Sequence, residues 1–183
     1  MIDLSMYMEK LTDVQFLEEE LKNGISLDNP DFMDLAKNTI AQLNGYGNTI
    51  LDYGAGVGAY SKAAIDAGYK VFTNEKFEAH KQYLVEKIPE INIVEKLPQT
   101  DILLLIEVAE HMTNDEIENL FDQIMPKWIL FSSTPYKTEW DNLWGHINVK
   151  SDLEWNDFFL KLHYREHKKV NLPTEWSKIY EKI

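Results

Sequence analysis

Three closely spaced glycines and an acid stand where a buried strand is expected to end and a helix to begin. The segment reads Asp52-Tyr53-Gly54-Ala55-Gly56-Val57-Gly58 and follows a short apolar run. Glycine is needed where a chain turns sharply and where its backbone approaches a ligand without an intervening Cβ atom. The spacing predicts a ligand-binding loop, with a plain tight turn as the alternative.

A second acid, Glu75, follows the next apolar run, 23 residues after Asp52. At the end of a neighbouring parallel strand, a carboxylate can accept hydrogen bonds from both hydroxyls of an adenosine ribose. The alternative is an ordinary exposed loop acid. Together, the glycine loop and Glu75 favour a nucleoside cofactor.

Two classes of nucleoside cofactor compete for this loop. Gly54, Gly56 and Ala59 satisfy the G-x-G-x-x-G/A pattern of dinucleotide-binding proteins. However, only about 125 residues follow the loop, which leaves no room for a separate substrate domain. S-Adenosylmethionine explains more, because backbone amides suit its carboxylate while acids suit its ammonium and hydroxyl groups.

A carboxylate–histidine cluster is predicted at the end of the fourth strand. Glu107, Glu110 and His111 follow one apolar run, and His146 follows the next expected strand. Either histidine could act as a general base on a substrate hydroxyl. Alternatively, the four side chains could bind a divalent ion, or Glu110 could cap a helix and His111 could simply pack. We assign catalysis to His111 and His146 and no residue to a metal.

Composition restricts the class of protein. The chain has 183 residues, 31 acids against 18 bases, a net charge of −13 and no cysteine. This length fits one domain with a substantial core. The lack of cysteine excludes disulfides and thiolate sites and indicates a reducing compartment.

The same composition bears on partners. The longest apolar run, 102–106, is far shorter than the ~20 residues of a membrane helix. The negative charge disfavours nucleic acid, although lysines and an arginine gather between 150 and 169. We therefore expect a soluble, cytoplasmic protein that does not contact a membrane and acts on a small molecule.

The elements that position these residues follow an α/β pattern. Short apolar runs alternate with helical spacing, which predicts a doubly wound, mostly parallel sheet with helices on both faces. We expect a single domain over 1–183, with an N-terminal helical cap at 1–45 and a Rossmann-like core at 46–183. The expected helices are 5–22, 31–43, 57–67, 77–87, 114–124 and 152–162, and the expected strands are 48–53, 70–74, 91–94, 101–107 and 128–132, followed by an antiparallel pair at 168–172 and 176–180.

These motifs resemble the class I S-adenosylmethionine-dependent methyltransferases over roughly residues 45–170. The resemblance rests on the Asp52–Gly58 loop, on Glu75 and on the segment 101–112, which is typical of the branch that methylates quinones, sugars and small metabolites. The segment 145–150 is similar to one found in many small members of the family. The resemblance implies a seven-stranded sheet of order 3-2-1-4-5-7-6, with the seventh strand antiparallel.

The resemblance also implies roles for residues. The loop (Asp52, Tyr53, Gly54, Gly56 and Gly58) would lie beside the methionine end of S-adenosylmethionine, Glu75 would hold the ribose, and Glu107 would line the pocket beneath the sulfonium. A methyl group would pass in line to an oxygen or nitrogen of a small acceptor, such as a sugar or hydroxylated metabolite. No acid-plus-apolar pair for the adenine follows the third strand.

Two alternatives stay open. The E-x-x-E-H spacing with a later histidine is similar to metal-assisted methyltransferases, including those acting on the terminal 2′-hydroxyl of small RNAs. A divalent metal is therefore a secondary cofactor candidate. A cofactor-binding protein of the same fold without catalysis is the other alternative.

Several aromatic, acidic and histidine residues lie outside these motifs. Met6, Tyr7, Met8 and Phe16 are expected to pack over the pocket and shape acceptor specificity, and Trp140 and Trp144 could form an apolar wall. The acidic run 18–20 is interpreted as a solvated helix face. No role is assigned to His80, His163 or His167.

Overall fold

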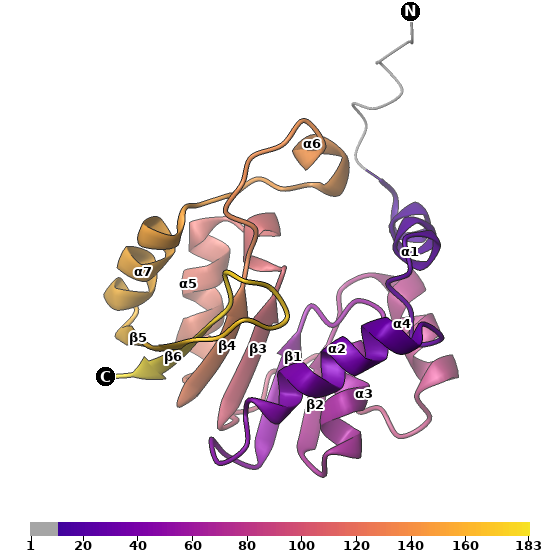
Figure 1. Ribbon diagram of the computed structural model, residues 1–183, viewed down its shortest axis with the longest axis horizontal. Coiled ribbons are helices and arrows are strands. Elements are labelled where there is room, and N and C mark those ends of the chain that lie inside the picture. The colour runs from indigo at the N-terminus through magenta and orange to yellow at the C-terminus, as the bar shows by residue number, and fades with distance from the viewer. Residues whose placement is uncertain (1–10) are drawn as a thin grey trace, which may run out of the picture.

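A computed structural model describes residues 11–183 and shows a six-stranded sheet with helices on both faces (Figure 1). The strand order is β2-β1-β3-β4-β6-β5. Strands β1 to β4 pair in parallel, and β6 is antiparallel to both β4 and β5. The strands are β1 (Thr49–Tyr53), β2 (Lys70–Asn74), β3 (Ile102–Ile106), β4 (Trp128–Ser132), β5 (Tyr164–Lys169) and β6 (Lys178–Lys182).

The expected strand at 91–94 does not form, so the prediction of seven strands and their order is not confirmed. This segment makes one isolated parallel bridge, between Thr73 and Ile93. The pairing stops because the side-chain amide of Asn74 donates to the Val94 carbonyl at 3.0 Å, where the next ladder bond would form. Beyond it, Pro98 has no N–H to donate to a ladder.

Seven α-helices are described. They are α1 (Asp13–Lys22), α2 (Pro30–Ala41), α3 (Ala59–Asp66), α4 (Glu78–Lys87), α5 (Asn114–Gln123), α6 (Asp141–Trp144) and α7 (Asp152–Lys161). Capping boxes at Thr12, Thr113 and Ser151 fix the starts of α1, α5 and α7. The short α6 was not predicted, and the part of the expected first helix before residue 11 lies outside the described residues.

The core has two layers, one on each face of the sheet. Alternate residues of β3 point to opposite faces, so that Leu104 packs with α2 and α3, whereas Leu103 and Leu105 pack with α5 and α7. Because both faces are covered, β3 is apolar along its whole length and β4 is apolar up to its last residue, Ser132. No helix within residues 11–183 combines the length and the apolarity that a bilayer crossing requires.

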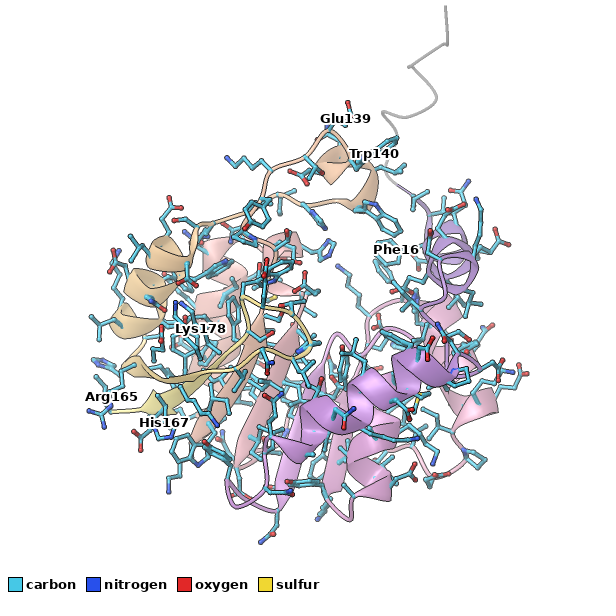
Figure 2. The ribbon with its side chains drawn as sticks, in the orientation of Figure 1. Phe16, Glu139, Trp140, Arg165, His167 and Lys178 are labelled. Atoms are coloured by element: carbon cyan, nitrogen blue, oxygen red, sulfur yellow. The ribbon has the colours of Figure 1, made fainter. Side chains whose placement is uncertain are left out.

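A buried lysine holds the antiparallel end of the sheet against α7. The Lys178 side chain is 2% exposed, and its ammonium lies 2.5 Å from Asp152 and 2.8 Å from the Asn156 amide oxygen (Figure 2). These two partners belong to α7, and a third, Glu166 of β5, lies 3.2 Å from the ammonium. A buried cation of this kind must be paired to be tolerated, and here the pairing joins β6 to the helix layer.

The parallel strands set the position of the candidate site. Gly54 follows β1, Glu75 follows β2 and Glu107 follows β3. Because carboxyl ends of parallel strands meet at one edge, these residues lie together at the crevice where open α/β sheets bind ligands.

Candidate active site

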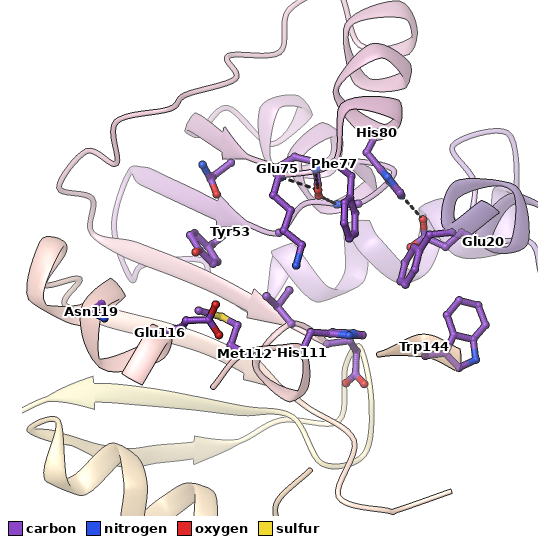
Figure 3. Close-up of a pocket in the computed structure, with 17 residues that line it drawn as sticks. Glu20, Tyr53, Glu75, Phe77, His80, His111, Met112, Glu116, Asn119 and Trp144 are labelled. Carbon is purple, nitrogen blue, oxygen red and sulfur yellow. Dashed lines mark hydrogen bonds and ion pairs between the residues drawn. The ribbon is translucent and has the colours of Figure 1, made fainter. Parts of the chain in front are cut away.

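A cavity of about 320 Å³ lies at this edge of the sheet (Figure 3). Its lining comes from the glycine loop, from the ends of β2 and β3, and from α1, α5 and α6. The predicted residues Tyr53, Gly54, Gly56, Glu75, Glu107 and His111 all line it. Residues far apart in the sequence therefore converge on one cavity.

The three loop glycines have different reasons to be glycine. All have positive φ angles, at which side chains are strained. A Cβ on Gly54 would lie 2.8 Å from Val108, and one on Gly58 would lie 2.3 Å from Leu84, so both permit close packing. Among the described residues, a Cβ on Gly56 would meet only the Glu20 carboxylate, at 3.5 Å. Gly56 thus leaves its backbone open to the cavity, whereas Gly58 lies outside the lining.

The Asp52 carboxylate lies behind the loop instead of in the cavity lining. It is 3% exposed and accepts a 2.7 Å hydrogen bond from the Ser61 hydroxyl, which lies 2.9 Å from the Thr73 hydroxyl. Burial raises the pKa of Asp52 to about 6, and the hydrogen bond from Ser61 opposes this rise. The residue therefore supports the loop from within the protein.

Glu75 connects the glycine loop to the start of α4. One carboxylate oxygen accepts the Gly56 N–H at 2.9 Å, and the other accepts the N–H groups of Lys76 and Phe77 at 2.8 and 2.9 Å. The side chain is buried at the cavity edge. Since an ionised carboxylate has about four acceptor positions, one remains for a ligand donor.

Glu107 is held in an unusual backbone conformation. Its φ angle is +52°, and its N–H donates to the Ser132 carbonyl at 2.7 Å. One carboxylate oxygen accepts hydrogen bonds from the Ser132 hydroxyl and, at 3.1 Å, from the Trp176 indole. A left-handed non-glycine residue costs about 1–3 kcal/mol and occurs preferentially at functional sites. These contacts fix where the carboxylate points.

Of the four side chains predicted to converge, Glu110, His111 and His146 come together, and Glu107 is not part of this group. The Glu110 carbonyl accepts the N–H groups of Ile147 and Asn148 at 2.8 and 2.9 Å, which joins the His146 loop to the 3₁₀ turn at 109–111. The two imidazole rings are 4.7 Å apart, and one ligand atom from each of the three residues lies within 4.8 Å of the others. His146 Nδ1 also lies 3.1 Å from the Asp141 carboxylate.

The Glu110 carboxyl is buried at the centre of this cluster. It is 1% exposed, and its Oε2 atom has no hydrogen-bond partner among residues 11–183. Burial, followed by the negative charge of Glu107, raises the pKa of Glu110 well above its ordinary value. The Glu110 carboxyl can therefore hold a proton or bind a cation.

Helix α1 forms a wall of the cavity. The Phe16 ring lies 5.4 Å from Trp144, 5.7 Å from Phe77 and 6.3 Å from His111, measured between centroids. Trp144 lines the cavity, whereas Trp140 does not. Met6, Tyr7 and Met8 lie outside the described residues, so their predicted packing is not tested.

The expectation of a solvated acidic run at 18–20 is wrong for Glu20. Its side chain is 13% exposed, lines the cavity and lies 2.6 Å from Nε2 of His80, which is 1% exposed. The sequence contains one signal for this: Glu20 follows Phe16 by four residues and shares its helix face. His80, which received no role, also lines the cavity.

The buried Asp52 predicts a pH dependence of stability. Its folded pKa of about 6 exceeds the ~3.9 of an unfolded aspartate, so its contribution is full below about pH 4 and is lost as the pH rises through 6. Asp52→Asn cannot ionise and keeps an acceptor for Ser61. Relative to the unchanged protein, we expect its free energy of unfolding to rise by about 2–3 kcal/mol between acid and neutral pH.

Urea unfolding from about pH 4 to about pH 8 measures this difference. A difference between the two proteins that stays constant across the range would contradict the assignment.

Comparisons with known proteins agree with this architecture. No protein-family model and no curated protein matches the sequence. Among solved structures, the chain is similar to a mitomycin 7-O-methyltransferase (17% identity, TM-score 0.63, 97% of this chain and 65% of that one). It is also similar to human N-acetylserotonin methyltransferase in complex with S-adenosylmethionine (11%, 0.66, 93% and 56%).

A third similar structure is a magnesium protoporphyrin IX methyltransferase from Synechocystis with bound S-adenosylhomocysteine (14% identity, TM-score 0.58, 98% of this chain and 92% of that one). The chain spans less than two thirds of the first two structures and nearly all of the third. These likenesses extend over almost the entire chain at low identity. The protein has the fold of the class I S-adenosylmethionine-dependent methyltransferases.

Proposed function

We propose that the protein is an S-adenosylmethionine-dependent methyltransferase that methylates an oxygen or nitrogen of a small molecule. The observation that carries this proposal is the joint between Glu75 and the Gly56 N–H at the cavity edge. It places the uncrowded Cα side of Gly56 next to a carboxylate that keeps one acceptor position, and a nucleoside with an amino-acid tail can lie against both.

The charges around the cavity fit this cofactor better than a dinucleotide. Among residues 11–183, four carboxylates line the space, from Glu20, Glu75, Glu107 and Glu116, against one lysine, Lys76. Such a lining attracts the sulfonium and ammonium charges of S-adenosylmethionine and repels a pyrophosphate. We therefore assign the cofactor contacts to Tyr53, Gly54, Gly56, Glu75 and Glu107. Asp52 and Gly58 support the loop from behind.

In methyl transfer, the cofactor and the residues that line the cavity have separate roles. S-Adenosylmethionine, when bound, supplies an electrophilic methyl group. Phe16 and Trp144 give the cavity an apolar wall, and holding both reactants in a fixed geometry lowers the barrier by several kcal/mol. No covalent intermediate on the enzyme is needed.

A histidine takes the proton when the acceptor is a hydroxyl. Because the Asp141 carboxylate can only accept a hydrogen bond, Nδ1 of His146 carries the hydrogen between them and Nε2 is left as the basic nitrogen. His111, whose ring is 4.7 Å away, is the second candidate base. We assign catalysis to this pair.

A metal-assisted reaction is the second candidate. It is favoured by the Glu110, His111 and His146 atoms within 4.8 Å of one another and by the unpartnered Oε2 of Glu110. In that case the imidazoles and the carboxylate would hold a divalent ion, and the acceptor would present two vicinal oxygens, as the 2′- and 3′-hydroxyls of a terminal RNA ribose do. A non-catalytic cofactor-binding protein remains the third.

A small acceptor is the choice that charge favours. The chain carries a net charge of −13, and carboxylates surround the cavity, which repels a phosphate backbone. The mitomycin and N-acetylserotonin enzymes are named for small-molecule acceptors. The cysteine-free sequence supports a cytoplasmic location.

Cofactor binding provides the first test of this function. S-Adenosylhomocysteine should bind in calorimetry and NAD should not. Glu75→Gln should weaken binding by about 10–100-fold, because a charged hydrogen bond contributes about 1.5–3 kcal/mol. Glu78→Gln is the matched control, because it removes the same charge from an exposed residue of α4. This variant should bind S-adenosylhomocysteine as the unchanged protein does. Preferential binding of NAD, or an unchanged affinity in folded Glu75→Gln, would sink the cofactor assignment.

The histidines provide a second test. With an acceptor identified by mass spectrometry of a metabolite extract, His111→Ala or His146→Ala should lower kcat by roughly 10²–10⁴ without changing the affinity for S-adenosylhomocysteine. His163→Asn is the control, since this exposed residue has a φ of +64° that asparagine tolerates.

Metal chelation separates the two chemistries. A general-base enzyme keeps its activity in a chelator. Loss of activity that added magnesium or zinc restores would establish the metal-assisted reaction, and full activity in both histidine variants would remove these residues from catalysis.

A further inference from the structure

We infer that Glu20 of α1 binds the ammonium group at the amino-acid end of the cofactor. This inference rests on the proposed function and adds a residue outside the parallel-sheet motifs to the cofactor site. Three observations support it: the position of the Glu20 carboxylate, the hydrogen bonds that the neighbouring carboxylates already accept, and the way α1 is held.

The Glu20 carboxylate faces the open side of the glycine loop. Its Oε1 atom lies 3.5 Å from the point that a Cβ on Gly56 would occupy, and within residues 11–183 no other atom apart from the adjoining residues lies within 4 Å of that point. The side chain lines the same cavity as Glu75. A ligand lying along the backbone of Gly56 therefore contacts Glu20 on its other side.

The neighbouring carboxylates are already engaged. Glu75 accepts three backbone N–H groups, and Glu107 accepts the Ser132 hydroxyl and the Trp176 indole. Glu20 has one described partner, Nε2 of His80, which contacts Oε2. Within residues 11–183, no hydrogen bond reaches Oε1. Glu20 therefore has the most acceptor capacity beside the loop, and an ammonium group brings three donors.

His80 fixes the orientation of Glu20. A carboxylate only accepts hydrogen bonds, so the 2.6 Å contact places the imidazole hydrogen on Nε2. His80 belongs to α4, whose start is bound by Glu75. The two carboxylates are thereby positioned from the same helix, one at its first turn and one through His80.

The aromatic side of α1 keeps Glu20 at the cavity. Phe16 lies one helical turn before Glu20 and projects from α1 toward the centre of the molecule (Figure 2). It packs with Phe77 and His80 of the α4 end and with Trp144 of α6. Because Phe16 and Glu20 share one face of α1, packing of the Phe16 ring also places the Glu20 carboxylate at the cavity.

The test compares two ligands that differ at the amino-acid end. S-Adenosylhomocysteine carries the ammonium group, whereas 5′-methylthioadenosine keeps the adenosine and lacks the entire amino-acid tail. Calorimetry of the full chain measures both affinities. In Glu20→Gln, we expect S-adenosylhomocysteine to bind at least about 10-fold more weakly, because a charged hydrogen bond is lost, and methylthioadenosine to bind as before.

Glu18→Gln removes the same charge from an exposed position of the same helix and should leave both affinities unchanged. An equal loss for both ligands in Glu20→Gln would show that the residue only holds α1 in place, and no loss for either would show that it does not touch the cofactor; each result overturns the inference. Failure of the proposed function looks different, since the unchanged protein would then bind neither ligand.

Discussion

The Glu75 carboxylate ties the glycine loop to the start of α4 by accepting three backbone N–H groups. The shape of the cavity follows from this joint. The loop is held so that the backbone of Gly56 stays open, and α4 is held so that Leu84 packs under Gly58. His80 of the same helix then meets Glu20, and α1 closes over the space. A single buried carboxylate thus links the sheet edge to the N-terminal wall.

Carboxyl groups gather at this edge of the sheet, at a cost in folding stability. Asp52 and Glu110 are both buried, and burial raises the pKa of each. Glu107 has a strained backbone, and its carboxylate increases the cost of ionising Glu110. Proteins tolerate such costs where they serve binding or catalysis. A cationic ligand would relieve part of this repulsion, which is consistent with a sulfonium cofactor.

Local sequence signals were enough to predict the central strands of the sheet and several of the residues that line the cavity. The strands β3 and β4 read as continuous apolar runs because both faces of the sheet are covered. The loop and Glu75 were recognisable because their spacing reflects a strand–turn–helix unit. Local rules also explain the capping boxes that start α1, α5 and α7.

What the sequence could not predict depends on contacts between distant segments. The bridge at Ile93 ends because an asparagine side chain replaces a ladder bond. Glu20 looked solvated because its partner, His80, lies 60 positions away. The difference between Gly56 and Gly58 is likewise set by Glu20 in one case and by Leu84 in the other.

A crystal structure grown with S-adenosylhomocysteine tests the central claim most directly. The account predicts ligand density within the cavity, with the ribose hydroxyls in hydrogen-bond reach of Glu75 and the amino-acid end along Gly54 and Gly56. Density for the ligand elsewhere on the molecule, or a cavity without ligand at saturating concentration while Glu75 keeps only its three backbone partners, would contradict it.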